Sequence, residues 1–514
     1  MITPDANGLY HPRSEDDVIA LIRHARANRL QVRVRGAAQS VPAGVFADEV
    51  PKGRNINIQL DKLRGVTFDK ERMRVTVQGG TNLHVDPRDP TSSERNGLYF
   101  QLNKRGWALP NVPAAAHQTV AGFLATGSAG GSTRHSFDEC VVAITLIDGT
   151  GERRTFTRTT DKNDPFYAMG SAMGLMGVIT AVTLQCVPGF NVIGSQATLP
   201  IGSLPLNFLG KAGVKKPSVA KYFANKEYAR MLWWPFRSVQ RMITWDAHTM
   251  RPADYKPKTT GTVKKFKPKP YQPTFPAFMG STLPARIIAA YGYLLIGTWP
   301  DWLVAIMGKG KPTEETEQLV EGVFPSLYPK LLNMFFPETT RKNPPQQFWD
   351  NWSGALEMDQ VEFSDELFNM VYTEIWVDLK DADRLVQAFQ SHYQADGTKA
   401  TWFYCVEILG GKSSDFWMSP GYGRDSLRLS INWWARNSER TMDYYQQFWD
   451  LLYQQGIPFR LHWGKYLAPP ASRTGASYLQ KQYPRWVEFM TLRKKMDPDN
   501  IFLNRYWRDQ LGIS

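Results

Sequence analysis

The chain has few cysteines, and it lacks the short motifs that mark common metal and nicotinamide sites. Only three cysteines occur in 514 residues, and Cys140, Cys186 and Cys405 show no Cys-x-x-Cys spacing. We expect each to be a small core side chain in a reducing compartment rather than half of a disulfide. None of the eight histidines forms a His-Glu-x-x-His pair, so no metal site is predicted. No Gly-x-Gly-x-x-Gly follows a strand pattern, which argues against a Rossmann unit.

Long apolar runs are also missing. Met1–Arg13 is polar and contains proline, so we expect no signal peptide. Ile287–Trp299 is 13 residues long and carries no charge, whereas a helix that spans a bilayer needs about 20 such residues. The pattern leaves three structures open: a buried helix, a cap over an apolar substrate site, or a segment that lies in a membrane interface with its tyrosines and tryptophans at the headgroups.

Basic residues outnumber acidic ones, 61 to 48, which gives a net charge of +13. Much of this excess lies in a proline-rich run, Lys256–Pro270, that cannot form a regular helix. It is either a solvated loop or, together with the apolar segment after it, a peripheral membrane contact through residues 256–310. No nucleic-acid-binding motif accompanies the charge, so no nucleic acid partner is predicted. We expect a cytoplasmic protein with possible membrane association.

A chain of this length suggests two domains of α+β class. Ser14–Asn28 has apolar residues at helical spacing and is followed by a strand at Leu30–Val34. From about Phe190 the pattern changes to aromatic-rich strands, with two across a turn in Tyr228–Trp245 and an amphipathic helix at Asp381–Tyr393. Further strands are predicted at Ile56–Leu60, Val66–Phe68, Met73–Val77, Val141–Ile147, Leu367–Leu379 and Trp402–Leu409.

Three loops of small residues, each beside a strand, fall within about 150 residues. They are Arg35–Ser40, Thr119–Gly130 and the start of Gly174–Leu184. A helix that begins at Phe166 is expected to lead into the strand of the third segment. Backbone without bulky side chains can approach a ligand closely, and glycine can take conformations that aim several N–H groups at one anion. A pyrophosphate or a flat ring system is the ligand that such loops favour.

The three loops resemble, in order, those of the FAD-binding domain of the vanillyl-alcohol oxidase superfamily. In that family they read Arg-Gly-x-Gly-His-Ser, Thr-Val-x-Gly-x-x-x-Thr-Gly-x-x-Gly and Gly-x-x-Gly-x-(Ile/Val)-Thr. The resemblance implies a two-domain FAD-binding fold of the PCMH type with an α+β substrate (cap) domain. The cofactor-binding residues that it implies are Arg35, Gly36, Ala37, Ala38, Gln39, Ser40, Thr119, Gly122, Thr126, Gly127, Ser128, Gly130, Gly131, Gly174, Gly177, Ile179, Thr180 and Asn504.

Four motifs of the C-terminal half are similar to the aldonolactone oxidase and alditol oxidase branch of that superfamily. They are Val406–Leu409, Asp415–Asp425, His462–Lys465 and Asp497–Asn504. In the branch the first reads Glu-(Ile/Val)-Arg and the third His-Trp-(Gly/Ala)-Lys. The resemblance implies an FAD domain at 1–189, a substrate domain at 190–465 with an insertion at about 251–346, and a segment at 466–514 that returns to the FAD domain.

The same motifs imply catalytic roles for Glu407, Lys465 and His462. A flavin that oxidises an alcohol accepts a hydride, and nearby cations stabilise the negative charge that develops on the ring. Lys465, with His462, is expected to provide that cation. Glu407 is expected to hydrogen-bond the reacting hydroxyl, as base or as positioning group.

Two residues depart from the family pattern. Gln39 stands where covalent members have the histidine that attaches the flavin, so we expect non-covalent FAD. Leu409 replaces the arginine of Glu-x-Arg, which removes a five-donor guanidinium and predicts a more hydrophobic alcohol than a sugar lactone. The electron acceptor is oxygen or a quinone-like molecule. A flavoprotein with impaired catalysis that serves as a binding or scaffolding subunit is the alternative function.

Overall fold

The computed structural model describes most of the chain. The described residues are 2–49, 54–235, 239–255, 267–272, 332–333, 336–358, 370–396, 405–434 and 441–513. The apolar segment Ile287–Trp299 and most of the basic run lie outside them, so the membrane and cap interpretations stay predictions. Within the described part, no helix is both long and apolar enough to cross a bilayer.

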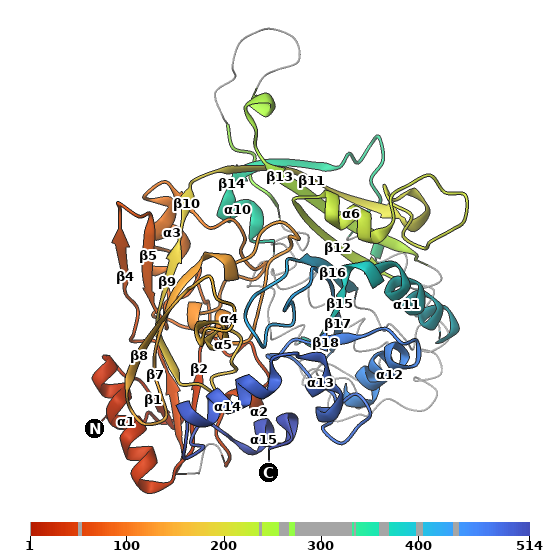
Figure 1. Cartoon of the computed structure of the whole chain (residues 1–514). Helices are drawn as coiled ribbons and strands as arrows, with labels where there is room; N and C mark the ends of the chain where they lie inside the picture. The colour runs from red at the N-terminus through yellow and green to blue at the C-terminus, as the bar shows by residue number, and fades with distance from the viewer. Residues whose placement is uncertain are drawn as a thin grey trace, which may run out of the picture.

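Two small sheets and a helix build the N-terminal half (Figure 1). A parallel sheet has the order β1-β3-β2, and an antiparallel sheet has the order β4-β5-β9-β7-β8. Helix α1 (Glu15–Asn28) confirms the helix predicted at Ser14–Asn28, with Ser14 as its N-cap, and buries Val18, Leu21 and Ile22 against this half. The strands are β1 (Leu9–Tyr10), β2 (Val32–Arg35), β3 (Ile56–Gln59), β4 (Val66–Asp69), β5 (Arg74–Gln78), β7 (Val141–Ile147), β8 (Arg153–Thr157) and β9 (Val178–Gln185), with β6 (Trp107–Ala108) pairing β10 (Val187–Pro188).

Short helices connect these strands, and one of them corrects a prediction. They are α2 (Pro42–Val45), α3 (Leu98–Asn103), α4 (Val120–Ala125) and α5 (Phe166–Met169). The helix predicted from Phe166 ends after one turn, because Ser171, Met173 and Gly174 all have positive φ and cannot continue a right-handed helix. The strand predicted after it is confirmed as β9.

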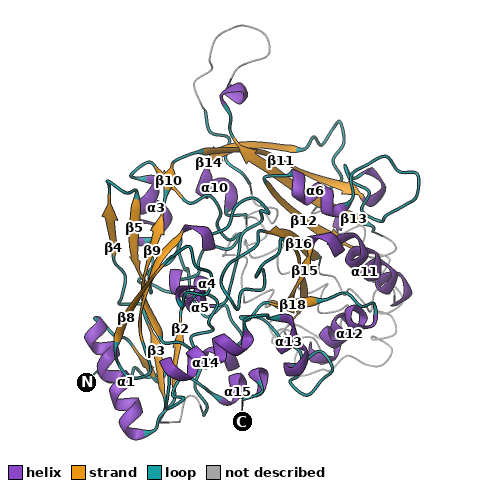
Figure 2. Cartoon of the chain, in the orientation of Figure 1, coloured by secondary structure: helices purple, strands orange, loops and turns teal. Residues whose placement is uncertain are grey.

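An eight-stranded antiparallel sheet forms the centre of the second half. Its order is β14-β11-β13-β12-β16-β17-β15-β18. The strands are β11 (Asn191–Pro200), β12 (Tyr228–Trp234), β13 (Arg241–Thr249), β14 (Gln346–Asn351), β15 (Met370–Asp378), β16 (Val406–Gly411), β17 (Ser426–Trp434) and β18 (Phe459–Leu461). Helices α6 (Val219–Asn225), α11 (Ala382–Asp396) and α12 (Thr441–Gln454) lie on the side of this sheet away from α1 (Figure 2); α10 (Trp352–Leu356) follows β14.

The two faces of the large sheet differ in polarity. Side chains alternate between faces along a strand, and residues opposite each other in an antiparallel pair share a face. Ile408 and its cross-strand partner Leu429 therefore lie on one face, whereas Glu407 and its partner Ser430 lie on the other. The polar face is directed at the N-terminal half, because Arg428 on β17 donates to the carbonyl oxygens of residues 129 and 130.

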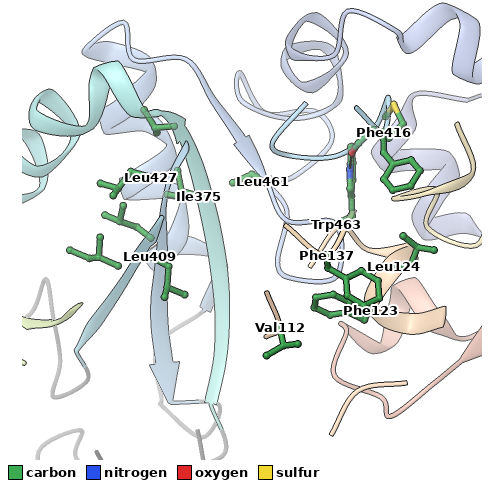
Figure 3. Packing of buried hydrophobic residues seen from close by; sticks show 14 of the residues in the cluster. Val112, Phe123, Leu124, Phe137, Ile375, Leu409, Phe416, Leu427, Leu461 and Trp463 are labelled. Carbon is green, nitrogen blue, oxygen red and sulfur yellow. Dashed lines mark hydrogen bonds between the residues drawn. The ribbon is translucent and has the colours of Figure 1, made fainter. Parts of the chain in front are cut away.

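One buried cluster joins the two halves. Figure 3 shows Phe123, Leu124 and Phe137 from the N-terminal half and Ile375 and Leu427 from the large sheet, all members of that cluster. The three cysteines are also buried and unbridged, as predicted.

The last helices return to the first half, and α15 packs against α2. Their bounds are α13 (Ala476–Gln482), α14 (Trp486–Met496) and α15 (Arg505–Leu511). The domain boundaries at residues 189 and 465 stay predictions.

Candidate active site

The three predicted loops meet around one pocket, which is completed by the His462–Lys465 turn. Its cavity volume is about 100 Å³, within a larger hollow that opens to solvent. Fifteen of the predicted site residues line it: Arg35, Gly36, Ala37, Ala38, Gln39, Ser40, Thr119, Gly122, Thr126, Ser128, Gly174, Gly177, Ile179, His462 and Lys465. Segments more than 400 residues apart in sequence thus form one wall.

Close backbone packing brings the loops together. Thr119 caps α4, where its Oγ1 accepts from the Gly122 backbone N–H at 3.2 Å. A Cβ on Gly36 would lie 2.2 Å from the same hydroxyl oxygen, so only glycine lets the first loop approach the second. Gly464 has the same role, because its Cβ would meet Ser40 Oγ at 2.8 Å. The loops and the turn are therefore in contact before any ligand binds.

Five predicted cofactor residues lie outside the pocket wall. Gly127, Gly130 and Gly131 are packed against neighbouring segments, and Gly127 has a positive φ of 71°. Thr180 is buried and donates to Glu15 Oε1 at 2.5 Å. Asn504 acts through α2, since its Nδ2 donates to the carbonyl oxygens of residues 43 and 46. These residues support the loops rather than line the pocket.

Lys465 places an ammonium group in the pocket wall. Its Nζ donates to the Gln39 carbonyl oxygen at 2.8 Å and lies 4.1 Å from the centre of the Tyr372 ring. Desolvation lowers the pKa of Lys465 to about 8, against the opposing effect of Glu374 and Glu407. Lys465 is therefore still mainly protonated at neutral pH.

His462 lies beside Lys465, but its charge differs from the prediction. Its Nδ1 accepts from the Gly464 backbone N–H at 3.0 Å, so the proton of the neutral ring is on Nε2, which lies 2.9 Å from Ser128 Oγ. Burial lowers the pKa of His462 to about 4. The expected cationic role thus falls to Lys465 alone, because a buried ring next to an ammonium group does not take up a second positive charge.

Glu407 is not among the residues that line this pocket, and it forms an ion pair that the sequence did not suggest. Its Oε1 accepts from Arg230 Nε at 2.6 Å, and its Oε2 lies 3.4 Å from Ser430 Oγ. Leu409 is buried two residues further along β16, with its Cδ2 next to Gly131. Arg230 on the neighbouring strand β12 thus places a guanidinium in the same region of the sheet as residue 409.

A second buried pair on the same face was also missed. Arg428 Nη1 lies 3.4 Å from Glu374 Oε1, and the Arg428 guanidinium lies over the Trp376 ring. Burial raises the pKa of Glu374, but the positive charges of Arg428 and Lys465 outweigh it and hold that pKa below its usual value. A carboxylate thus balances the cations around the turn.

Arg33 is a further pocket residue that sequence reasoning missed. It is fully enclosed, and its Nη atoms donate to the carbonyl oxygens of Phe502, Met173 and Gly44. Burial lowers its pKa to about 9. Its position in the middle of the short predicted strand was the only sign in the sequence that Arg33 is buried. Its three partners come from distant segments and could not be predicted.

Gln39 lines the pocket beside two basic side chains. In the amide orientation that satisfies both of its polar atoms, its oxygen accepts from Arg88 Nη1 at 2.8 Å and its nitrogen donates to His117 Nε2 at 3.1 Å. Burial lowers the pKa of His117 to about 3. Non-covalent binding of the flavin stays a prediction.

The residues around the pocket suit a flavin dinucleotide. Within the described residues, the buried Nε atoms of Arg33 and Arg35 have no hydrogen-bond partner, and an anionic group such as a pyrophosphate would provide one. A Cβ on Gly174 would meet no atom nearer than the Arg33 guanidinium at 3.8 Å, so the third loop leaves space there. Among the described residues, no cluster of histidine, cysteine or carboxylate side chains could hold a metal ion.

Comparison with known families agrees with this pocket. Residues 6–157 match the model of the FAD binding domain, and residues 320–510 match that of D-arabinono-1,4-lactone oxidase. The chain is 23% identical to L-gulonolactone oxidase of Mus musculus over 512 residues, which is 97% of this chain and 93% of that protein. It is 27% identical to D-arabinono-1,4-lactone oxidase of Eremothecium gossypii over 252 residues, 48% of this chain and 41% of that protein.

A solved structure shows the same fold. Cholesterol oxidase from Brevibacterium sterolicum matches with a TM-score of 0.68 over 98% of this chain and 93% of that one, at 15% identity. The α+β, two-domain FAD-binding fold of the PCMH type is thereby confirmed. The chain thus combines an FAD binding domain with a D-arabinono-1,4-lactone oxidase region, and it resembles the aldonolactone oxidase branch of the vanillyl-alcohol oxidase superfamily.

Proposed function

We propose that the protein uses FAD to oxidise a polyhydroxylated CH–OH donor, a sugar lactone or an alditol, and passes the electrons to oxygen. The observation that carries this proposal is the Lys465 ammonium in the wall of the pocket that the three predicted flavin loops line, near the carboxylate of Glu407. The relatives named as lactone oxidases support the substrate class.

The chain supplies charge and hydrogen bonds at fixed positions. When bound, FAD accepts the hydride of the CH–OH carbon, so that two electrons leave the donor and a carbonyl remains. Lys465 is held by the Gln39 carbonyl oxygen and stabilises negative charge on the group in the pocket. Glu407 accepts the hydroxyl proton or positions the hydroxyl, and Arg230 holds its carboxylate in place.

The test is anaerobic reduction of the purified holoenzyme by a panel of donors. We expect a lactone or alditol to bleach the flavin spectrum, and readmitted oxygen to restore it with one hydrogen peroxide per donor. Recovery with a quinone but not with oxygen would make the protein a dehydrogenase. A spectrum that no donor bleaches would favour the alternative of a binding or scaffolding subunit.

A hydrophobic alcohol is the second candidate donor. Leu409 is buried, and its side chain and that of Met358 both lie close to Gly131. Each buried methylene of a substrate would add up to about 0.8 kcal/mol of binding. A series of alcohols of increasing chain length separates the two candidates. A KM that falls steadily with chain length would support the hydrophobic donor and count against the lactone.

We further propose that the protein is cytoplasmic and that residues 256–310 either contact a membrane or cover the substrate site. Deleting Lys256–Gly310 separates these roles. Loss of binding to anionic liposomes with unchanged activity on soluble donors would support membrane contact, and the reverse pattern would support a cover.

A further inference from the structure

We propose that Arg230 supplies the substrate-reading guanidinium that the Glu-x-Arg motif would place at residue 409. The inference rests on the proposed function, because it names the residue that selects the donor at the same site. The chain keeps the glutamate of the motif as Glu407 but has Leu409 where the motif has arginine.

The strand register places Arg230 directly beside Leu409. In the antiparallel pair of β12 and β16, Arg230 lies opposite Leu409 and Leu232 lies opposite Glu407. Opposite residues point to the same face with Cβ atoms about 4.5–5.5 Å apart. A guanidinium on residue 230 therefore starts within one side-chain length of the position that an arginine at residue 409 would occupy.

The contacts of Arg230 lead to the motif carboxylate. Its Nε lies 2.6 Å from Glu407 Oε1, and its side chain is only 6% exposed. A charge pair withdrawn from water is costly unless its geometry is fixed by further partners. The pair lies beside the second flavin loop, because Leu409 Cδ2 approaches Gly131 and the Ala229 backbone N–H donates to the Gly131 carbonyl oxygen at 3.0 Å.

Arg428, the other arginine opposite Leu409, has a different role. It lies on β17, on the other side of β16. Its Nη atoms donate to the carbonyl oxygens of Ala129 and Gly130 at 3.1 and 3.0 Å, and its nearest carboxylate is Glu374. It fixes the flavin loop to the sheet, whereas Arg230 is bound to Glu407, the carboxylate proposed to hydrogen-bond the reacting hydroxyl.

The chemistry of a guanidinium fits the proposed donor. Its planar array of N–H donors binds two oxygen atoms at once, as in a ring carbonyl or adjacent hydroxyls, while a lysine acts as a point charge. Arg230 would therefore favour a donor rich in oxygen atoms over a simple alcohol of equal size. An oxygen-poor donor would not make those hydrogen bonds.

The test compares selectivity in Arg230 variants of the holoenzyme. For each variant, kcat/KM is measured for a sugar lactone and for a simple primary alcohol, and the Kd of a non-oxidisable lactone analogue is measured from the flavin spectrum. Arg230→Met should lower kcat/KM for the lactone by ~10–150-fold more than for the alcohol, the loss expected for one hydrogen bond to a charged group. Analogue binding should weaken by a similar factor.

Two further variants separate recognition from structure. The exchange Arg230→Leu with Leu409→Arg returns the guanidinium to β16 at nearly constant volume, and should recover most of the selectivity. Arg241→Met is the matched control, because Arg241 is equally buried on the next strand and is paired with Glu338 at 2.9 Å. It should leave the lactone-to-alcohol ratio unchanged even where stability falls.

The outcomes distinguish this inference from the proposed function. If the parental flavin is reduced by no CH–OH donor, the proposed function itself is wrong. If the parent oxidises lactones but Arg230→Met lowers kcat equally for both donors with unchanged analogue binding, Arg230 only positions Glu407. That result would overturn the inference, as would an exchange variant that folds with FAD but has no selectivity.

Discussion

Replacing Lys465 by methionine removes one positive charge from the flavin pocket while nearly preserving side-chain length. In the structure the ammonium is held by the Gln39 carbonyl oxygen at 2.8 Å, with its pKa lowered from 10.5 to about 8 by desolvation. That shift corresponds to a cost of ~3 kcal/mol for keeping the charge there. A cation held at such a cost is fixed in advance where negative charge develops during reduction.

We therefore expect Lys465→Met to slow reduction of the flavin by the donor ~10²–10³-fold, the usual effect of losing one preorganised stabilising group. The assay is anaerobic stopped-flow reduction at saturating donor. The melting temperature should not fall, since the variant no longer keeps a desolvated charge. Lys481→Met, at an exposed position, is the control and should reduce at the parental rate.

The lowered pKa of Lys465 predicts that the rate of flavin reduction depends on pH. Lys465 carries its charge below a pKa of about 8 and loses it above. Parental reduction should therefore slow as the pH rises through 8, by about tenfold per unit well above it. Lys465→Met should be slow at every pH and lack this limb, whereas Lys465→Arg should keep its rate to higher pH. The reasoning would be refuted if Lys465→Met reduced the flavin at the parental rate and its rate fell above pH 8 as in the parent.

Three other predictions concern the carboxylate, the cofactor link and the buried histidine. Glu407→Gln should retain FAD and lose turnover, which flavin content and steady-state rates measure together; an unchanged kcat would remove Glu407 from the mechanism. Because Gln39 offers no nucleophile, acid precipitation should leave the flavin in the supernatant, and flavin fluorescence in the protein band of a denaturing gel would contradict this. The folded pKa of His462 is about 4 and the unfolded value is about 6.5, so the unfolded chain binds the extra proton between these values. The free energy of unfolding should therefore fall by up to ~3 kcal/mol as the pH drops from 6.5 to 4, and His462→Asn should flatten that slope in urea titrations.

Local patterns in the sequence were sufficient for the strands, the first helix and the flavin loops. Ser14–Asn28 and Val141–Ile147 fold as their periodicity indicates. An element that is buried on one side repeats its apolar residues about every 3.6 positions in a helix and every 2 positions in a strand. The small residues of the first loop predicted the pocket for a similar reason. Close approach of two backbone segments requires a small side chain at the point of contact. The residue type at that one position therefore reveals the requirement in the sequence.

Only the tertiary structure decided which charges meet. Arg230 and Glu407 are 177 residues apart and pair because β12 and β16 are neighbours in the sheet; no local pattern records that register. The neutral state of His462 likewise depends on burial and on the Gly464 N–H, both created by folding. The sequence thus determined which residue types could bind FAD and oxidise an alcohol. Long-range packing determined which of them are charged, and which arginine faces the motif carboxylate, because desolvation and cross-strand contact exist only in the folded chain.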